Sequence, residues 1–205
     1  MFDNYIKQIP DKINYEKYVL NNGLTVVLAN VSKIFTVDVK LFIKVGAQYE
    51  NREINGISHF LEHMVFKGTN KKPSHTLLVK DVDDHGGIQN AWTGYENTTY
   101  YTHIGSEYLE YALDFLSDLF TNCIFPEKEF QKEKGVIIEE IRMYEDEPKT
   151  KAEDLFIEAL YGDQPAGWNL AGTEENNKNM TREKMVKYYQ KYYHPKNAVL
   201  FITGN

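Results

Sequence analysis

The sequence predicts an α+β fold in which a mostly antiparallel β-sheet is flanked by helices. Three observations predict it. First, short segments rich in β-branched residues alternate with helical segments in the first half of the chain. Second, helical periodicity dominates from residue 106 onward. Third, no internal repeat and no linker rich in proline, glycine or serine interrupts the 205 residues. We therefore expect a single domain spanning residues 1–205.

Five segments are expected to form strands. In residues 36–45 the apolar Val37, Val39, Leu41 and Ile43 occupy alternate positions, and Asp38, Lys40 and Lys44 lie among the intervening ones, as in a strand with one buried face. Residues 23–30 begin at a glycine and are rich in β-branched side chains. The same signals predict strands at residues 88–92, 98–104 and 198–203.

Six segments show the apolar spacing or the end signals of helices. Glycines are expected to end the first two, Ser106 to cap the third, and Pro148 to end the fourth. The acidic and amide-rich residues 174–177 are expected to form a solvated loop. The expected helices are residues 56–67, 74–86, 106–120, 126–147, 151–161 and 181–193.

Composition and charge exclude several classes of protein. The net charge is −7, from 23 Lys+Arg against 30 Asp+Glu, and no basic stripe is present, so a nucleic-acid partner is not expected. The single Cys123 permits no internal disulfide and is interpreted as a small buried residue. The sequence shows no signal-peptide core and no apolar run of the roughly 20 residues that a membrane helix needs. We therefore expect a cytoplasmic protein with no membrane partner.

The segment Ser58–Phe66 carries the side chains on which the functional prediction depends. On a helix, His59 and His63 lie one turn apart on the same side, and Glu62 lies on that side too. The remaining positions are apolar except for Ser58, and no Lys, Arg or Asp is present, so the helix is expected to be buried. A metal ion would pair with the imidazoles there and polarise a water molecule for the carboxylate to deprotonate. The alternative is a pair of hydrogen-bonded core histidines.

A zinc site of this kind needs a third protein ligand. The helix expected at residues 126–147 offers two candidates, because its apolar stripe around Ile137 places Glu133 and Glu140 on the core-facing side. Glu139, in contrast, is expected to point to solvent. The alternative is an acidic helix edge, since this segment is rich in glutamate throughout.

Together these two segments resemble the pitrilysin-type zinc metallopeptidases, a family that includes insulysin and the mitochondrial processing peptidases. The resemblance rests on the His-x-x-Glu-His motif within Gly56–Met64 and on the block Glu133–Glu140, with 76 residues between His63 and Glu140. It implies that Glu62 is the catalytic base and that Glu133 supports the metal site from outside the ligand set. The ligands that it implies for one zinc ion per chain are His59, His63 and Glu140.

The resemblance extends over nearly the whole chain. Residues 86–93 resemble the family's edge strand, which pairs with an extended peptide substrate, so Asn90, Ala91 and Trp92 are expected to bind substrate. Residues 192–195 and 198–205 are similar to the end of the family's first domain. The implied function is that of a zinc-dependent endopeptidase acting on extended peptides, similar to the bacterial branch of the processing peptidases.

Members of that family have a second, metal-free half, and this chain ends where the first half would end. We therefore expect the N-terminal catalytic half of a peptidase, either truncated or completed by a separate polypeptide, including a second copy in a homodimer. Two alternatives stay open. One is a non-catalytic subunit that pairs with a separate half-peptidase, and the other is a structural metal-binding module without peptidase activity.

Overall fold

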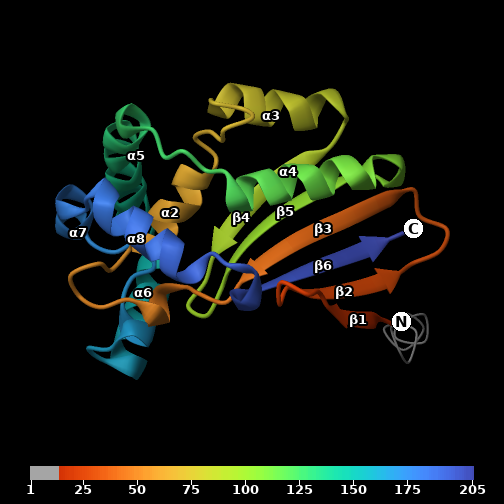
Figure 1. The fold of residues 1–205 in the computed structure, drawn as a ribbon. Coiled ribbons are helices and arrows are strands. Elements are labelled where there is room, and N and C mark those ends of the chain that lie inside the picture. The colour runs from red at the N-terminus through yellow and green to blue at the C-terminus, as the bar shows by residue number, and fades with distance from the viewer. Residues whose placement is uncertain (1–13) are drawn as a thin grey trace.

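The computed structural model describes residues 14–205 and is built around a six-stranded sheet in the order β1-β2-β6-β3-β5-β4 (Figure 1). All neighbouring strands are antiparallel except β2 and β6, which run parallel. The mostly antiparallel α+β fold predicted from the sequence is therefore confirmed. The strands are β1 (Glu16–Val19), β2 (Thr25–Asn30), β3 (Thr36–Ile43), β4 (Ile88–Thr93), β5 (Thr98–Gly105) and β6 (Ala198–Gly204).

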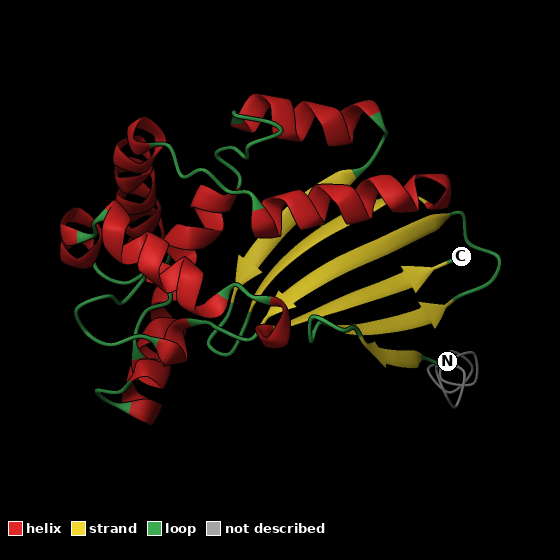
Figure 2. Cartoon of the chain, in the orientation of Figure 1, coloured by secondary structure: helices red, strands yellow, loops and turns green. Residues whose placement is uncertain are grey.

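The helices form two groups (Figure 2). The first group, α3 (His75–Asp84) and α4 (Leu109–Thr121), lies along one face of the sheet and contacts β3, β4 and β5. The second group gathers beyond the end of the sheet where β3 and β4 finish. It comprises α2 (Ile57–Val65), α5 (Glu127–Asp146), α6 (Pro148–Tyr161), α7 (Glu174–Asn179) and α8 (Arg182–Tyr192). Short 3₁₀ turns occur at Ala47–Tyr49, Ser106–Tyr108, Pro165–Gly167 and Pro195–Asn197.

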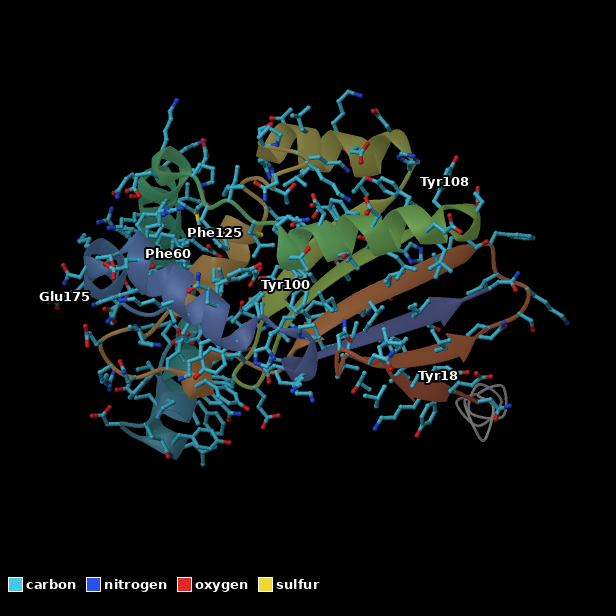
Figure 3. All side chains as sticks on the ribbon, in the orientation of Figure 1. Tyr18, Phe60, Tyr100, Tyr108, Phe125 and Glu175 are labelled. Atoms are coloured by element: carbon cyan, nitrogen blue, oxygen red, sulfur yellow. The ribbon has the colours of Figure 1, made fainter. Side chains whose placement is uncertain are left out.

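The core joins the sheet to both groups of helices. Alternate residues of β3, from Val37 to Ile43, are buried as the sequence predicts. On α2, Phe60 is fully buried and packs on Phe130 of α5, with ring centroids 4.8 Å apart. Figure 3 shows Phe60 and Tyr100 in this interior, whereas Tyr18 lies at the outer edge of the sheet. This packing holds α2 against α5, the two helices that carry the predicted ligands.

Three local predictions differ from the structure. Ser106 does not cap α4, because it begins a 3₁₀ turn and the helix starts only at Leu109. The loop predicted at residues 174–177 is wrong, since α7 forms there behind a capping box of Thr173 and Asn176 and buries Asn177. Strand β1 was not predicted, because all four of its residues are exposed and show no apolar alternation.

No helix within residues 14–205 combines the length and the apolar character that crossing a membrane requires.

Candidate metal centre

The start of α2 is fixed by a buried carboxylate. Glu50 accepts hydrogen bonds from the backbone N–H groups of Gly56 (2.8 Å) and Ser58 (2.9 Å) and from the side-chain amide of Asn55 (3.0 Å). These donors include groups at the helix N-terminus, which have no partner within the helix. Burial raises the pKa of Glu50, although the hydrogen bonds that it accepts oppose this shift. The contact therefore orients the helix that carries both predicted histidine ligands.

Two glycines allow a second segment to cross the start of α2. Gly56 has a φ of +93° and Gly172 a φ of +74°. A Cβ atom on Gly56 would lie 2.3 Å from the carbonyl oxygen of Ala171, and one on Gly172 would lie 2.3 Å from that of Asn55. Only glycine fits both the backbone conformation and the close approach. The crossing gives the beginning of α2 a second anchor.

Helix α5 turns two of its glutamates toward α2. Glu133 is buried and Glu140 is half-buried, because both lie on the side of the helix that carries the buried Ile137 and Ile141. Glu139 points away and pairs with Arg142 at 2.7 Å. The structure thus orients these three glutamates as the helical spacing predicts.

His59, His63 and Glu140 converge at the interface of α2 and α5. Each offers a ligand atom, and these three atoms lie within 4.8 Å of one another. The Glu140 carboxylate is 3.7 Å from Nε2 of His59 and 3.5 Å from Nε2 of His63. Tetrahedral zinc with bonds of about 2.0–2.2 Å places its ligand atoms roughly 3.3–3.6 Å apart. The separations therefore suit a single zinc ion, and this is the only such cluster within residues 14–205.

The electrostatics of His59 also suit a metal, whereas His63 has to lose its proton to bind one. Burial, followed by the charge of His63, lowers the pKa of His59 to about 3, so its ring is neutral at pH 7. Burial opposes the charged form of His63, but its hydrogen bond to Glu133 and the charge of Glu140 leave its pKa raised. Two imidazoles and one carboxylate form a donor set typical of zinc peptidases. The residues present therefore fit a zinc ion.

Glu133 contacts the ring nitrogen of His63 that does not face Glu140. Its carboxylate lies 2.9 Å from Nδ1 of His63 and 2.7 Å from Nζ of Lys67. Burial raises the pKa of Glu133, but its contacts with His63 and Lys67 outweigh that effect and lower it. An ionised carboxylate at Nδ1 favours the tautomer that leaves Nε2 free to bind a metal. Lys67 had no signal in the sequence, because its role depends on a contact with a helix 66 residues away.

Replacing Glu133 with glutamine should weaken zinc binding roughly 10- to 100-fold. The amide retains the size of the carboxylate but loses the negative charge that orients His63 and makes it more basic. Competition with a chromophoric chelator would measure this affinity. The matched control is Glu139→Gln on the exposed side of the same helix, and equal affinities for the two variants would contradict the role assigned to Glu133.

Glu62 lies next to the cluster on the same helix. Its Oε2 accepts a hydrogen bond of 2.5 Å from the hydroxyl of Thr93, the last residue of β4. Burial raises the pKa of Glu62, against the opposing effect of this hydrogen bond. A raised pKa makes the carboxylate a stronger proton acceptor, as a general base requires.

The predicted substrate residues lie on β4, which forms an edge of the sheet. Asn90 and Trp92 are exposed on one face, whereas Ala91 packs against the core on the other. The backbone N–H of Gly94 donates to the carbonyl oxygen of Asn97, so these two residues form a hydrogen-bonded pair where β4 and β5 meet. Hydrogen-bonded and non-hydrogen-bonded pairs alternate along antiparallel strands. The backbone N–H and C=O groups of Gln89, Ala91 and Thr93 therefore point away from β5. The N–H of Ala91 is bonded instead to the side-chain oxygen of Asn90 at 2.8 Å. Substrate binding by Asn90, Ala91 and Trp92 stays a prediction.

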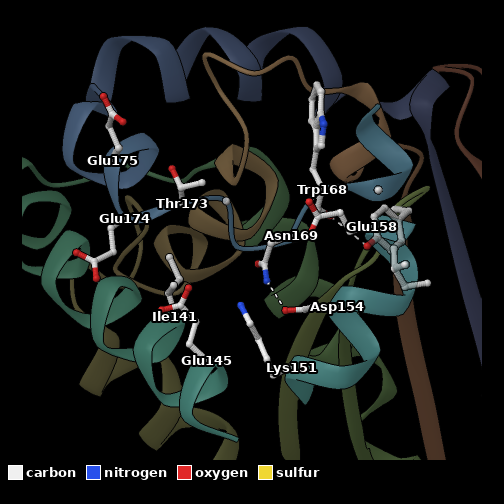
Figure 4. Close-up of a pocket in the computed structure, with 14 residues that line it drawn as sticks. Ile141, Glu145, Lys151, Asp154, Glu158, Trp168, Asn169, Thr173, Glu174 and Glu175 are labelled. Atoms are coloured by element: carbon white, nitrogen blue, oxygen red, sulfur yellow. Dashed lines mark hydrogen bonds between the residues drawn. The ribbon is translucent and has the colours of Figure 1, made fainter. Parts of the chain in front are cut away.

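An acidic cavity of about 410 Å³ lies between α5, α6 and the segment before α7 (Figure 4). On one wall, the amide of Asn169 donates to Asp154 at 2.8 Å. The lining contains none of the residues predicted to bind metal or substrate, so this cavity is distinct from the metal cluster. Its charged residues are Glu145, Lys151, Asp154, Glu158, Glu174 and Glu175.

Comparison with known proteins agrees with the fold. The zinc protease YmxG of Bacillus subtilis is 40% identical over 190 residues, which are 93% of this chain and 46% of that protein. The crystal structure of a protease from Helicobacter pylori superposes with a TM-score of 0.89 at 29% identity, covering 94% of this chain and 46% of the other. An M16-like peptidase from Alicyclobacillus acidocaldarius gives a TM-score of 0.86 at 26% identity, with coverage of 96% and 47%.

These relatives are longer than this chain, which spans about half the length of the curated proteins that it matches. Residues 179–205 match the family described as Peptidase M16 inactive domain. Residues 25–174, which include α2 and α5 with the whole metal cluster, match the family described as Insulinase (Peptidase family M16). The chain therefore belongs to the insulinase family, peptidase family M16.

Proposed function

We propose that residues 1–205 form the catalytic domain of a zinc-dependent endopeptidase that hydrolyses extended peptides. The observation that carries the proposal is the convergence of His59, His63 and Glu140 within 4.8 Å, next to Glu62. The relatives named as zinc proteases support the same chemistry.

Three side chains would hold the metal. His59 and His63 offer their Nε2 atoms from one side, and Glu140 offers its carboxylate from α5. Glu133 would hold His63 in the orientation that the metal requires. Zinc bound there would act as a Lewis acid toward a water molecule and toward the carbonyl group of the scissile bond.

Glu62 would act as the general base and then as the general acid. It would accept a proton from the attacking water and pass that proton to the amine released by cleavage of the peptide bond. Its half-buried position suits both steps, because burial raises the pKa of the carboxyl group and so makes the carboxylate a stronger proton acceptor.

The substrate would bind as an additional strand at the edge of the sheet. The outward backbone groups of Ala91 and Thr93 offer hydrogen bonds to an extended peptide, as in β-augmentation. The exposed side chains of Asn90 and Trp92 would lie beside alternate residues of that peptide. Occupation of the edge would displace the contact between Asn90 and the N–H of Ala91.

A second half-length domain would complete the enzyme. The chain spans 46% and 47% of the lengths of two relatives, so the remaining half would be the rest of the polypeptide, a separate subunit or a second copy. The exposed sheet edge leaves room for such a domain to contribute further contacts to substrate.

Removal of the metal tests the proposal. The full-length protein should cleave an internally quenched peptide, lose that activity completely on dialysis against 1,10-phenanthroline, and recover it when one equivalent of zinc is added. Activity that survives complete metal removal would overturn the mechanism. Zinc binding without cleavage of any peptide would instead favour the non-catalytic metal-binding subunit.

A further inference from the structure

Thr93 occupies an unusual position at the end of the edge strand β4. The alternation of hydrogen-bonded pairs between β4 and β5 turns its backbone N–H and C=O outward, away from β5. Those groups lie at the edge to which an extended peptide would add. The side chain of Thr93 instead contacts α2, because its hydroxyl donates to the carboxylate of Glu62.

The hydroxyl of Thr93 makes the only side-chain hydrogen bond of Glu62 within the described part of the chain. It donates to Oε2 at 2.5 Å, across 31 residues of sequence. Threonine is branched at Cβ and therefore stiff at χ1, and here it is further held by the backbone of a strand. The donor is thus fixed, whereas the glutamate side chain has three rotatable bonds. The orientation of the Glu62 carboxylate consequently depends on Thr93.

We propose that Thr93 is a positioning residue for Glu62 and couples the docking of a peptide strand at β4 to the orientation of the general base. This inference rests on the proposed function and adds to it a residue outside the predicted site. A peptide strand that pairs with the outward N–H and C=O of Thr93 immobilises the end of β4. The hydroxyl, which already holds the carboxylate before a peptide binds, is thereby held more firmly, so the base stays in place while the substrate is bound.

Three variants of the full-length protein test this coupling. Thr93→Val has the same shape without the hydroxyl, and Thr93→Ser retains the hydroxyl without the methyl group. The matched control is Thr102→Val on the neighbouring strand β5. Thr102 is fully buried, and its hydroxyl has no hydrogen-bond partner within residues 14–205. Each variant is compared with the wild type in kcat, in KM and in zinc affinity.

The valine variant at position 93 should lose roughly 10- to 100-fold in kcat, as expected for a misplaced catalytic group. Its KM should stay within about twofold of the wild type, because the backbone groups that would bind the peptide are unchanged. Zinc affinity should be unchanged in all three variants. Thr102→Val should retain wild-type kcat, and Thr93→Ser, which keeps the hydroxyl but not the stiff χ1, should lose much less than Thr93→Val. Wild-type kcat in Thr93→Val, or an equal loss in Thr93→Ser, would overturn the proposal.

A crystal structure of Thr93→Val separates this inference from the proposed function. The carboxylate of Glu62 should leave the position that it occupies beside residue 93, and a carboxylate that stays in place would overturn the positioning role. Absence of peptide cleavage by the wild type would refute the proposed function alone, because the position of Glu62 in the variant can still be observed.

Discussion

Replacing Glu62 with glutamine should abolish peptide hydrolysis while leaving zinc bound. The amide cannot accept a proton from water, so the variant loses general-base catalysis, which contributes roughly 10²- to 10⁴-fold to rates. Glu62 is not among the three converging ligands, so the affinity for zinc should change little. Cleavage of a quenched peptide and metal content by mass spectrometry would be measured on the same preparation.

The control for this variant is Glu110→Gln, an exposed substitution of the same kind in the first turn of α4. It should retain both wild-type activity and wild-type zinc content. Two outcomes would contradict the role of Glu62. Undiminished cleavage by Glu62→Gln would exclude it as the base, and loss of zinc from that variant would make it a ligand.

The parts of the site that could be predicted from the sequence depend on the geometry of single helices. His59 and His63 share a face of α2 because they are four residues apart, and Glu133 and Glu140 share a face of α5 because they are seven apart. That the two faces meet follows from their apolar neighbours, since Phe60 and Phe130 pack together at the interface. The resemblance to a known family supplied the pairing of the two helices.

Glu50, Lys67 and Thr93 could not be predicted as parts of the site. Each of them acts through a contact that only the folded structure creates. Glu50 accepts a hydrogen bond from the backbone of Ser58, eight residues later, and Thr93 donates to Glu62 across 31 residues. Neither the periodicity nor the composition of the surrounding segments distinguishes these side chains from ordinary polar residues. The burial of Glu50 was also unexpected from the sequence, because an acidic residue that precedes a helix is usually exposed to solvent.

The error at residues 174–177 has a different cause. Charge and amide content suggested a solvated loop, but Thr173 and Asn176 form a capping box that begins a short helix. Asn177 is fully buried, and its amide donates to the carbonyl oxygens of Ala171 and Thr173. The helix therefore holds the segment that crosses the start of α2. Polar composition here reflects buried hydrogen bonding, which hydropathy alone does not distinguish from exposure to solvent.

Replacing Glu140 with glutamine should weaken zinc binding more than roughly 100-fold, because even residues outside the ligand set contribute 10- to 100-fold. A neutral amide is a poor ligand, and only two imidazoles would remain. The loss should also appear as a loss of metal-linked stability. Wild-type protein in zinc at 100 times its dissociation constant should gain about 2.7 kcal/mol in the free energy of unfolding. The variant should gain almost nothing at the same zinc concentration, as a thermal denaturation series would show.

Glu139→Gln is the matched control for Glu140→Gln. It removes the same charge from the adjacent residue of the same helix, on a side chain that is 71% exposed and points away from α2. A general effect of charge on α5 would weaken zinc binding in both variants, whereas a ligand role predicts the loss in Glu140→Gln alone. Equal zinc affinity in the wild type and both variants would show that Glu140 is not the third ligand. The metal cluster would then require a different third ligand, and the proposed function would have to be rebuilt on that basis.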